Sequence, residues 1–437
     1  MSNAKPKKRI CPADFCIERL RMVCLAVVVV AAIGQAAGGA SAAEEATWSA
    51  TIDKAAWSKF GFQYPVTYVF RIAPVPTDLE VKRRDADSAP WTPLAKKTSA
   101  QFFNGVECVR VDEENSRVYV SVGFQTTNTI QLQFAGAPAA TFEGVAKYYD
   151  NRQAAYTLSN DNWGCNPWAK PGAAWHGLTS DESDRYQAAL SVCRSFHLPV
   201  TIAINSRMPG GEGVWPVMQK ELDRHDYSWE PAVHGRTHPK DKGYLVLGYK
   251  SEILGCRQDI LEHLRHIPYG QYVVEHILTF GYMDDEIFKT DAGEFLFLRG
   301  FNWLDNPSSN GYVPWNKRYR FYGVGGLNTK GYDALMERHE PKGRFRAHDV
   351  AELNAGFDAI HQAGGIFYAL WHPDRFLNSI LYDPAPGADG LRGSTLMQHL
   401  SHVANRKDVW YVANGWLYSY RYVAENVKAA GPVKRGN

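Results

Sequence analysis

Two histidines, His234 and His238, lie four residues apart directly after a short apolar run. Four residues make about one helical turn, so both imidazole rings can face a single metal ion. Pro239 disfavours helical geometry at His238, which predicts a single turn at the end of a strand and not the middle of a long helix. A zincin also carries a Glu between its histidines, and here Gly, Arg and Thr fill the gap. The plain alternative is one surface histidine and one helix-capping histidine.

Two more polar positions follow apolar runs elsewhere in the chain. Asp161 lies in Leu158-Ser-Asn-Asp-Asn162, and His372 follows the run from Ile366 to Trp371. In sheets of parallel strands, the loops at the carboxyl ends of the strands carry the chemistry. Metal-assisted amide hydrolysis needs a Lewis acid for the carbonyl, a base for the water, donors for the oxyanion and an acid for the leaving amine. These residue types can supply each part.

The three segments together resemble the NodB, or polysaccharide deacetylase, family. Its first motif is a strand ending in Thr-Phe-Asp-Asp, its second is His-Ser/Thr-x-Ser/Thr-His with a Glu upstream, and its late motif is Leu-x-His. The residues that match the second motif are Glu230, His234, Thr237, His238 and Pro239, while Gly235 replaces the first hydroxyl residue. The resemblance covers roughly residues 150 to 425. It implies a distorted, incomplete (β/α) barrel with a groove across its top.

The first motif departs from the family pattern and allows two alignments. Aligning Ser159 with the motif's hydroxyl residue puts Asp161 at the general-base position and Asn162 at the metal-ligand position. A shift by one residue makes Asp161 the ligand and Asn160 the base. The first alignment is preferred because Ser159 replaces a hydroxyl, whereas the second places Leu158 there. Asn and Asp also favour plain turns after strands, so the segment has a purely structural reading too.

The resemblance further assigns proton donation to His372, for which a surface histidine before Pro373 is the alternative. Arg299 lies where the family varies. A direct Arg-Pro-Pro-Tyr match is missing, and the nearest counterpart, Thr279 to Tyr282, has no Arg. Arg299 therefore either holds Asp161 ionised from the next strand or forms an ordinary surface ion pair.

Tryptophans lie beside the proposed loops, and three of them are candidate substrate contacts: Trp163, Trp303 and Trp371. Aromatic faces suit the apolar faces of sugar rings, although a Trp is more often part of the core. The expected metal ligands are His234, His238 and Asn162. Imidazole suits divalent transition ions, which makes Zn²⁺ the expected ion.

Residues 1–42 have the layout of a secretory signal peptide, with a basic stretch, a short apolar run and Ala40-Ser-Ala42 at the end. The expected protein is exported, without a stable membrane anchor. Removing this segment takes away six Lys/Arg and two Asp/Glu, which changes the formal net charge from +2 to −2. Nothing in that balance indicates a nucleic-acid partner. The remaining cysteines are too sparse for a disulfide scaffold, with one weak candidate pair, Cys165 and Cys193; the full set is Cys108, Cys165, Cys193 and Cys256.

Two patterns divide the rest of the chain. Residues 43–148 contain short β-type runs that alternate apolar and polar residues, which predicts a small all-β sandwich. This sandwich either contacts carbohydrate or only packs against its neighbour. In residues 149–437 apolar runs alternate with helical patterns, which predicts an α/β fold with parallel strands, in keeping with a NodB-type barrel. The expected strands there are 199–204, 274–280, 294–299, 366–371 and 409–412.

The sequence is thus expected to encode an exported, metal-dependent carbohydrate deacetylase that removes N-acetyl groups from an N-acetylated amino-sugar glycan. One alternative is a NodB-like module that binds glycan without catalysis, prompted by the missing second Asp of the first motif. Another is a related metal-dependent hydrolase that acts on a different amide or ester.

Overall fold

The computed structural model describes residues 46–57, 59–98, 104–125, 127–137, 139–163, 190–191, 193–207, 214–224, 229–300, 310–323, 329–331, 347–371 and 395–431. The expected signal peptide and Cys165 lie outside these residues. Residues 44–437 form one compact unit. The division expected near residue 148 and the export of the chain stay predictions.

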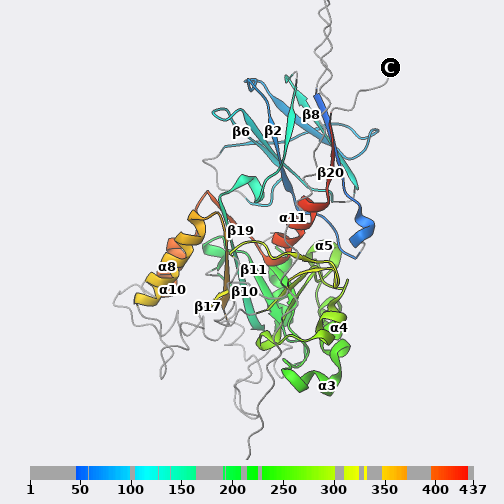
Figure 1. The fold of residues 1–437 in the computed structure, drawn as a ribbon, viewed down its shortest axis with the longest axis vertical. Helices are drawn as coiled ribbons and strands as arrows, with labels where there is room; N and C mark the ends of the chain where they lie inside the picture. The colour runs from blue at the N-terminus through cyan, green and yellow to red at the C-terminus, as the bar shows by residue number, and fades with distance from the viewer. Residues whose placement is uncertain are drawn as a thin grey trace, which may run out of the picture. The chain divides into compact units, whose positions relative to one another are not determined.

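Residues 46–145 form most of two five-stranded sheets (Figure 1). One sheet has the order β20-β1-β8-β3-β4, where β20 is Lys428–Ala430, β1 Ala46–Thr51, β8 Thr129–Ala135, β3 Glu80–Arg84 and β4 Thr92–Pro93. The other has the order β5-β6-β7-β2-β9, with β5 Lys96–Lys97, β6 Cys108–Asp112, β7 Arg117–Val122, β2 Val66–Arg71 and β9 Thr141–Val145. All pairings are antiparallel except the one between β5 and β6.

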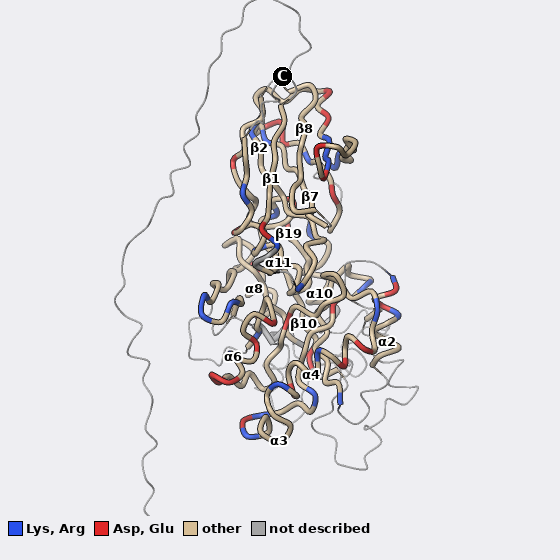
Figure 2. Tube along the Cα trace, turned by 90° about the vertical axis from the view of Figure 1, so that its right-hand side faces the viewer, with Lys and Arg blue, Asp and Glu red and all other residues tan. Residues whose placement is uncertain are grey.

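The alternation read from the sequence explains these strands. In β8 the side chains of Ile130, Leu132 and Phe134 are buried, and the residues between them are partly exposed. Strands β1 and β8 lie side by side over their whole length (Figure 2). Strand β20 was not predicted, because Lys-Ala-Ala has neither alternation nor an apolar run. It joins this sheet only by pairing with β1.

A ten-stranded sheet carries the site. Its order is β15-β16-β14-β13-β12-β11-β10-β18-β17, and β19 also pairs with β10. The strands are β10 Ala154–Trp163, β11 Val200–Ile204, β12 Trp229–Val233, β13 Glu275–Ile277, β14 Phe297–Arg299, β15 Trp315–Asn316, β16 Phe321–Gly323, β17 Thr329–Gly331, β18 Ile366–Trp371 and β19 Val409–Tyr411. Every pairing is parallel except that of β15 with β16. The predicted mixed α/β fold with parallel strands is confirmed. The pairing path does not close among the described residues, so the barrel stays a proposal.

Helices cover one face of this sheet. They are α2 Val214–Leu222, α4 Tyr249–His263, α6 Asp285–Asp291, α8 Ala347–Gln362 and α10 Thr395–Val403. Helix α4 buries Ile253, Cys256 and Ile260, which lie on one face of the helix. Helices α8 and α10 lie side by side (Figure 1), and α8 packs against β18 and β10. The described cysteines are buried free thiols, so Cys193 makes no disulfide within the described chain.

The closing helix α11, Asn414–Asn426, packs on the opposite face of the sheet. Tyr418 of α11 stacks on Phe297 of β14 with ring centroids 3.8 Å apart. Trp416 of the same helix stacks at 4.6 Å on Tyr64, which precedes β2. One hydrophobic cluster therefore includes α11, the inner face of the parallel sheet and the two antiparallel sheets.

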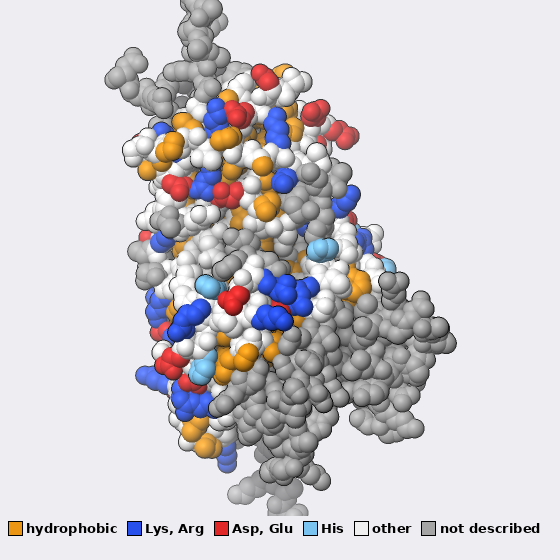
Figure 3. Space-filling model, turned by 180° about the vertical axis from the view of Figure 1, so that it is seen from behind, with side chains coloured by type: hydrophobic (Ala, Val, Ile, Leu, Met, Phe, Trp, Pro, Cys, Tyr) orange, Lys and Arg blue, Asp and Glu red, His pale blue; other side chains and the backbone are white. Residues whose placement is uncertain are grey.

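The surface mixes charge types. On the face seen in Figure 3, basic and acidic side chains are interspersed over the described part. Large exposed apolar side chains gather on the short helix α3, Tyr244–Leu247, where Leu245 and Val246 are exposed. Among the described residues, no helix has the length and apolar composition needed to cross a bilayer.

A buried polar layer crosses the inner face of the sheet. Glu230 accepts hydrogen bonds from the Thr201 hydroxyl at 2.9 Å, from the Gly415 amide at 2.5 Å and from the Tyr269 hydroxyl. Glu275 accepts a bond from Asn414 Nδ2 at 2.9 Å, and its other oxygen has no partner among the described residues. Three donors therefore hydrogen-bond to the Glu230 carboxylate, whereas one donor among the described residues bonds to that of Glu275. Burial first, and then the neighbouring Glu230, raises the pKa of Glu275 well above its usual value.

Glu275→Gln is expected to stabilise the protein at neutral and alkaline pH. A raised carboxyl pKa means that the group favours folding fully at low pH, and that this contribution is lost as pH rises above the unfolded pKa. Gln has the size of a protonated Glu but does not ionise, so the variant does not lose this stability. The loss in the parent protein amounts to about 1.4 kcal/mol for each unit by which the folded pKa exceeds the unfolded pKa. Urea unfolding of both proteins at pH 5 and pH 8 measures the effect. If the free energy of unfolding changes equally with pH in both proteins, folding does not raise the pKa of Glu275.

Candidate functional site

Three parallel strands place the candidate side chains at one edge of the sheet. Asp161 is near the end of β10, His234 directly follows β12, and Arg299 is the last residue of β14. Because the strands run in the same direction, their carboxyl ends meet at the same edge. The sequence prediction of a shared strand-end position is confirmed for these three residues.

A bulge lies at the first motif. Along β10, Asn160 is opposite Ile202 and Trp163 is opposite Ile204, so Asp161 and Asn162 together face one residue of β11. Bulges kink a strand and re-aim the side chains in it, and they occur often beside active sites. Asp161 is 1% exposed. The sequence showed the polar residues here but not the extra residue in the ladder.

Asp161 forms an ion pair with Arg299. Both side chains are 2% exposed, so the reading of Arg299 as a surface residue is wrong. Strands β10 and β14 are separated by three others, and in a flat sheet they would be about 19 Å apart. The sheet must therefore curve strongly for the pair to form. The second carboxylate oxygen of Asp161 is buried and has no partner among the described residues.

A backbone carbonyl orients the first of the two histidines. His234 is 2% exposed and its Nδ1 lies 2.8 Å from the Ile277 carbonyl oxygen, so Nδ1 carries the proton. An imidazole protonated at Nδ1 carries its lone pair on Nε2, and this is the tautomer typical of metal-ligating histidines. The His238 ring lies beside it, with centroids 5.0 Å apart. Residues 234–240 form bends and no helix, in keeping with the effect expected of Pro239.

Two residues with left-handed backbone geometry meet at this segment. His238 has φ +55° and Phe280 has φ +53°, and their ring centroids are 4.5 Å apart. Such geometry is strained for residues other than Gly and is often found at functional sites. Phe280 was expected at the end of a strand, yet β13 ends at Ile277 and Thr279–Gly281 form a tight turn instead. Phe280 is a contact of the site that the sequence did not indicate.

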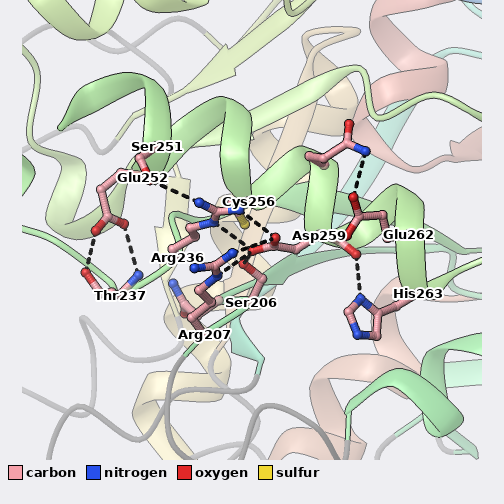
Figure 4. Close-up of polar contacts among 12 residues, drawn as sticks. Ser206, Arg207, Arg236, Thr237, Ser251, Glu252, Cys256, Asp259, Glu262 and His263 are labelled. Carbon is pink, nitrogen blue, oxygen red and sulfur yellow. Dashed lines mark hydrogen bonds and ion pairs between the residues drawn. The ribbon is translucent and has the colours of Figure 1, made fainter. Parts of the chain in front are cut away.

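Helix α4 holds the residues between the two histidines (Figure 4). Arg236 donates two hydrogen bonds to the Asp259 carboxylate, at 2.6 and 2.8 Å. The Thr237 hydroxyl and amide donate to the two oxygens of Glu252, at 2.7 and 3.0 Å. Glu252 and Asp259 are seven residues apart, which is two helical turns and hence one face of α4. That spacing was visible in the sequence, but its partners were not.

The Asp259 carboxylate accepts hydrogen bonds from other residues as well. Ser206 donates to it at 2.6 Å and Arg207 at 3.3 Å, both from the end of β11 (Figure 4). Although burial opposes the change, the hydrogen bonds from Arg236, Ser206 and Arg207 lower the pKa of Asp259. The carboxylate therefore stays ionised and links the end of β11 to the histidine segment.

Gly255→Ala is expected to weaken metal binding without destabilising the protein. A Cβ at Gly255 would lie 2.5 Å from the Arg236 guanidinium carbon and would displace this side chain from Asp259. Alanine in a helix gains up to about 1 kcal/mol over glycine, which offsets the lost contact. Loss of a supporting contact behind metal ligands typically costs about tenfold or more in affinity. Calorimetric Zn²⁺ titration and thermal unfolding measure the two effects.

Gly356→Ala in α8 is the matched control, because a Cβ there meets nothing within 4 Å. It should gain the same helical stability and bind Zn²⁺ like the parent protein. Equal affinities in both variants would show that the contact between Arg236 and Asp259 does not position the histidines.

Several predicted site residues are not tested by the structure. His372 and Trp303 lie outside the described residues, as do the side chains of Asn162 and Trp371. Trp163 is described and is 0% exposed within a hydrophobic cluster. The sugar-contact reading of Trp163 is therefore wrong, because the bulge turns its ring into the core.

The described side chains supply two of the ligands that a divalent transition ion needs. Two imidazoles with one oriented Nε2 suit Zn²⁺. Within the described chain no three His, Cys, Asp or Glu side chains are grouped as ligands of one ion would be. A third ligand must then be an oxygen of another kind, such as an amide, or come from outside the described part.

No protein-family model and no curated protein matches this sequence. Solved structures do show likeness. A Mycobacterium smegmatis protein named as a supposed polysaccharide deacetylase is 14% identical, with 67% of this chain and 99% of that chain covered and a TM-score of 0.45. A Pseudomonas aeruginosa protein with a similar name is 11% identical, with 63% and 93% covered and a TM-score of 0.46.

A CE4 family pseudoenzyme from Bacillus anthracis is 12% identical, with 63% of this chain and 69% of that chain covered and a TM-score of 0.34. The resemblance drawn from the three sequence motifs recurs in these comparisons. Of these three solved structures, two are named as polysaccharide deacetylases and one as a pseudoenzyme, and the sequence identity to each is low.

Proposed function

We propose that this chain is an exported metal-dependent deacetylase that releases acetate from an N-acetylated amino-sugar glycan. The observation that carries the proposal is the buried pair of Asp161 and Arg299 at the same sheet edge as the oriented His234. A carboxylate with one oxygen held by Arg299 and the other without a partner is suited to accept a proton from water. Zn²⁺ is the proposed ion, with His234, His238 and Asn162 as ligands.

The proposed reaction assigns one task to each side chain. His234 and His238 would hold a divalent ion, which would supply Lewis acidity toward the acetyl carbonyl. Asp161 takes the proton of the attacking water, whose oxygen bonds to the carbonyl carbon. Arg299 holds the Asp161 carboxylate in place through their ion pair. The bond from carbon to nitrogen then breaks, and His372 is proposed to protonate the leaving amine, which leaves acetate and a free amino sugar.

The first alignment of the motif agrees best with these contacts. The Asp161 carboxylate is engaged with Arg299 and is not grouped with the two histidines among the described residues. That arrangement supports Asp161 as the base and leaves Asn162 for the ion. A binding module without catalysis is favoured by one observation, the amide of Asn162 where the family motif has its second carboxylate.

Acetate release from N-acetylated oligosaccharides tests the proposal. The expected result is release that is lost after chelation and restored by Zn²⁺. Glycan binding without release supports the non-catalytic module. Release only from O-acetylated substrates indicates the related ester hydrolase instead. The N-terminal residue of the exported protein, expected just after Ala42, tests the signal peptide.

A further inference from the structure

A tryptophan with polar neighbours lies on the outer face of the sheet that contains β3, β4 and β8. Strand β3 ends at Arg84, the chain turns, and Trp91 directly precedes β4. Thr92 pairs with Arg83, so Trp91 returns opposite Arg84. Along β3 the residues alternate between buried and partly exposed, and Arg84 is on the exposed side. Gln131 of β8 is next to Arg84 on the same side.

The Arg84 guanidinium is held on three sides of its plane. Its Nε donates to Gln131 Oε1 at 2.7 Å, its Nη1 to the Asp87 carbonyl at 2.7 Å and its Nη2 to Asp87 Oδ1 at 2.9 Å. Gln131 Nε2 also donates to Asp87 Oδ1 at 2.7 Å. Because Nε, Nη1 and Nη2 all donate hydrogen bonds in the plane of the guanidinium, its flat faces are what remain for stacking. One of them lies over the Trp91 ring, 4.5 Å from the centroid.

This network holds the Arg84 guanidinium, which in turn covers one face of the Trp91 ring. Trp91 is half-buried, and the side chain of Asp87, which binds the same guanidinium, is 86% exposed. A rigid aromatic ring loses little conformational entropy when a partner stacks on it. Asp87 adds acceptor oxygens for hydroxyl groups, since only its Oδ1 receives the side-chain bonds described above.

A second stack of the same kind shows what a purely structural pair looks like. Arg110 lies over Tyr119 at 4.2 Å and bonds to Asp150. Tyr119 is 4% exposed and the Asp150 side chain is 9% exposed. That pair is closed to solvent. The stack of Arg84 and Trp91 has similar geometry, but its acidic member extends into solvent.

We propose that Trp91, Arg84, Asp87 and Gln131 form a second glycan-binding site, separate in sheet and sequence from the histidine edge. A sugar ring has an apolar face that stacks on an aromatic ring and hydroxyl groups that bond to carboxylates at its rim. The charges of Arg84 and Asp87 balance, which suits an uncharged sugar. Among the described residues, none of the large exposed apolar side chains belongs to β3, β4 or β8, so this surface lacks the apolar patch that a hydrophobic protein partner would use. The choice of an N-acetylated polymer as the ligand rests on the proposed function.

Binding to an insoluble N-acetylglucosamine polymer tests the site in the full exported chain. Trp91→Ala should bind the polymer about tenfold more weakly, because stacking on the ring is lost. It should release acetate from short soluble oligosaccharides like the parent protein. Lys82→Ala is the matched control, since Lys82 is on the same strand and pairs with Glu80 at 2.9 Å. Polymer binding by Trp91→Ala equal to that of the control overturns the proposal.

Two further proteins keep the test decisive. If Trp91→Ala does not fold, Asp87→Ala takes its place, because this exposed side chain should weaken polymer binding severalfold, and unchanged binding again overturns the site. The His234→Ala/His238→Ala protein should still bind the polymer through Trp91. If that protein loses polymer binding altogether, the histidine edge is the glycan-binding surface and the second site is wrong. If acetate release fails in the parent protein while Trp91-dependent binding remains, only the proposed function falls.

Discussion

Replacing both His234 and His238 by alanine is expected to abolish stoichiometric Zn²⁺ binding and acetate release together. The contact of His234 Nδ1 with the Ile277 carbonyl oxygen leaves the lone pair on Nε2, and the centroid of the His238 ring lies 5.0 Å from that of His234. Two imidazoles are the only nitrogen ligands in the proposed set, and a neutral amide oxygen cannot hold a transition ion alone. Equilibrium dialysis followed by metal analysis measures the loss.

His402→Ala is the control for this result. His402 lies in α10 and its Nε2 contacts Asp358 at 3.0 Å. That variant should keep both metal and activity. If the double alanine protein retains one equivalent of Zn²⁺ after dialysis, the metal site is elsewhere. If it loses Zn²⁺ but still releases acetate, the ion has no part in the chemistry.

Asp161→Asn is expected to leave Zn²⁺ bound and to reduce acetate release by about a hundred- to ten-thousand-fold. Asn keeps the size of the side chain and an oxygen for Arg299, but it cannot accept the proton of water. Asn162→Asp should tighten Zn²⁺ binding and leave catalysis present, because an ionised oxygen attracts the cation more strongly than a neutral one. Zn²⁺ affinity and acetate release are measured for both variants.

The opposite alignment of the first motif gives the reverse result. There Asp161→Asn loses Zn²⁺, and Asn162→Asp changes the affinity little. If neither variant changes affinity or turnover, the assignment of the motif is wrong and the non-catalytic module gains support. A thermal unfolding control is needed for Asp161→Asn, since weakening a buried ion pair can cost several kcal/mol of stability.

The placement of the site residues at the ends of strands could be predicted from the sequence, because it follows from local periodicity. Apolar runs predicted the parallel strands, and the polar residues after them had to lie at one sheet edge. Pro239 excluded a long helix at the histidines for a local steric reason. The β8 alternation predicted its buried and exposed faces in the same way. Each of these inferences needs only neighbours within a few residues.

Tertiary structure alone decided which partner each side chain has. Arg299 reaches Asp161 only because a sheet of parallel strands curves, and curvature is a property of the whole sheet. The bulge at Asp161 depends on the register with β11, and it turns Trp163 into the core. Arg236 finds Asp259 because Gly255 leaves room for it. Such contacts join residues far apart in the chain, so no local pattern contains them, and packing between elements determines them.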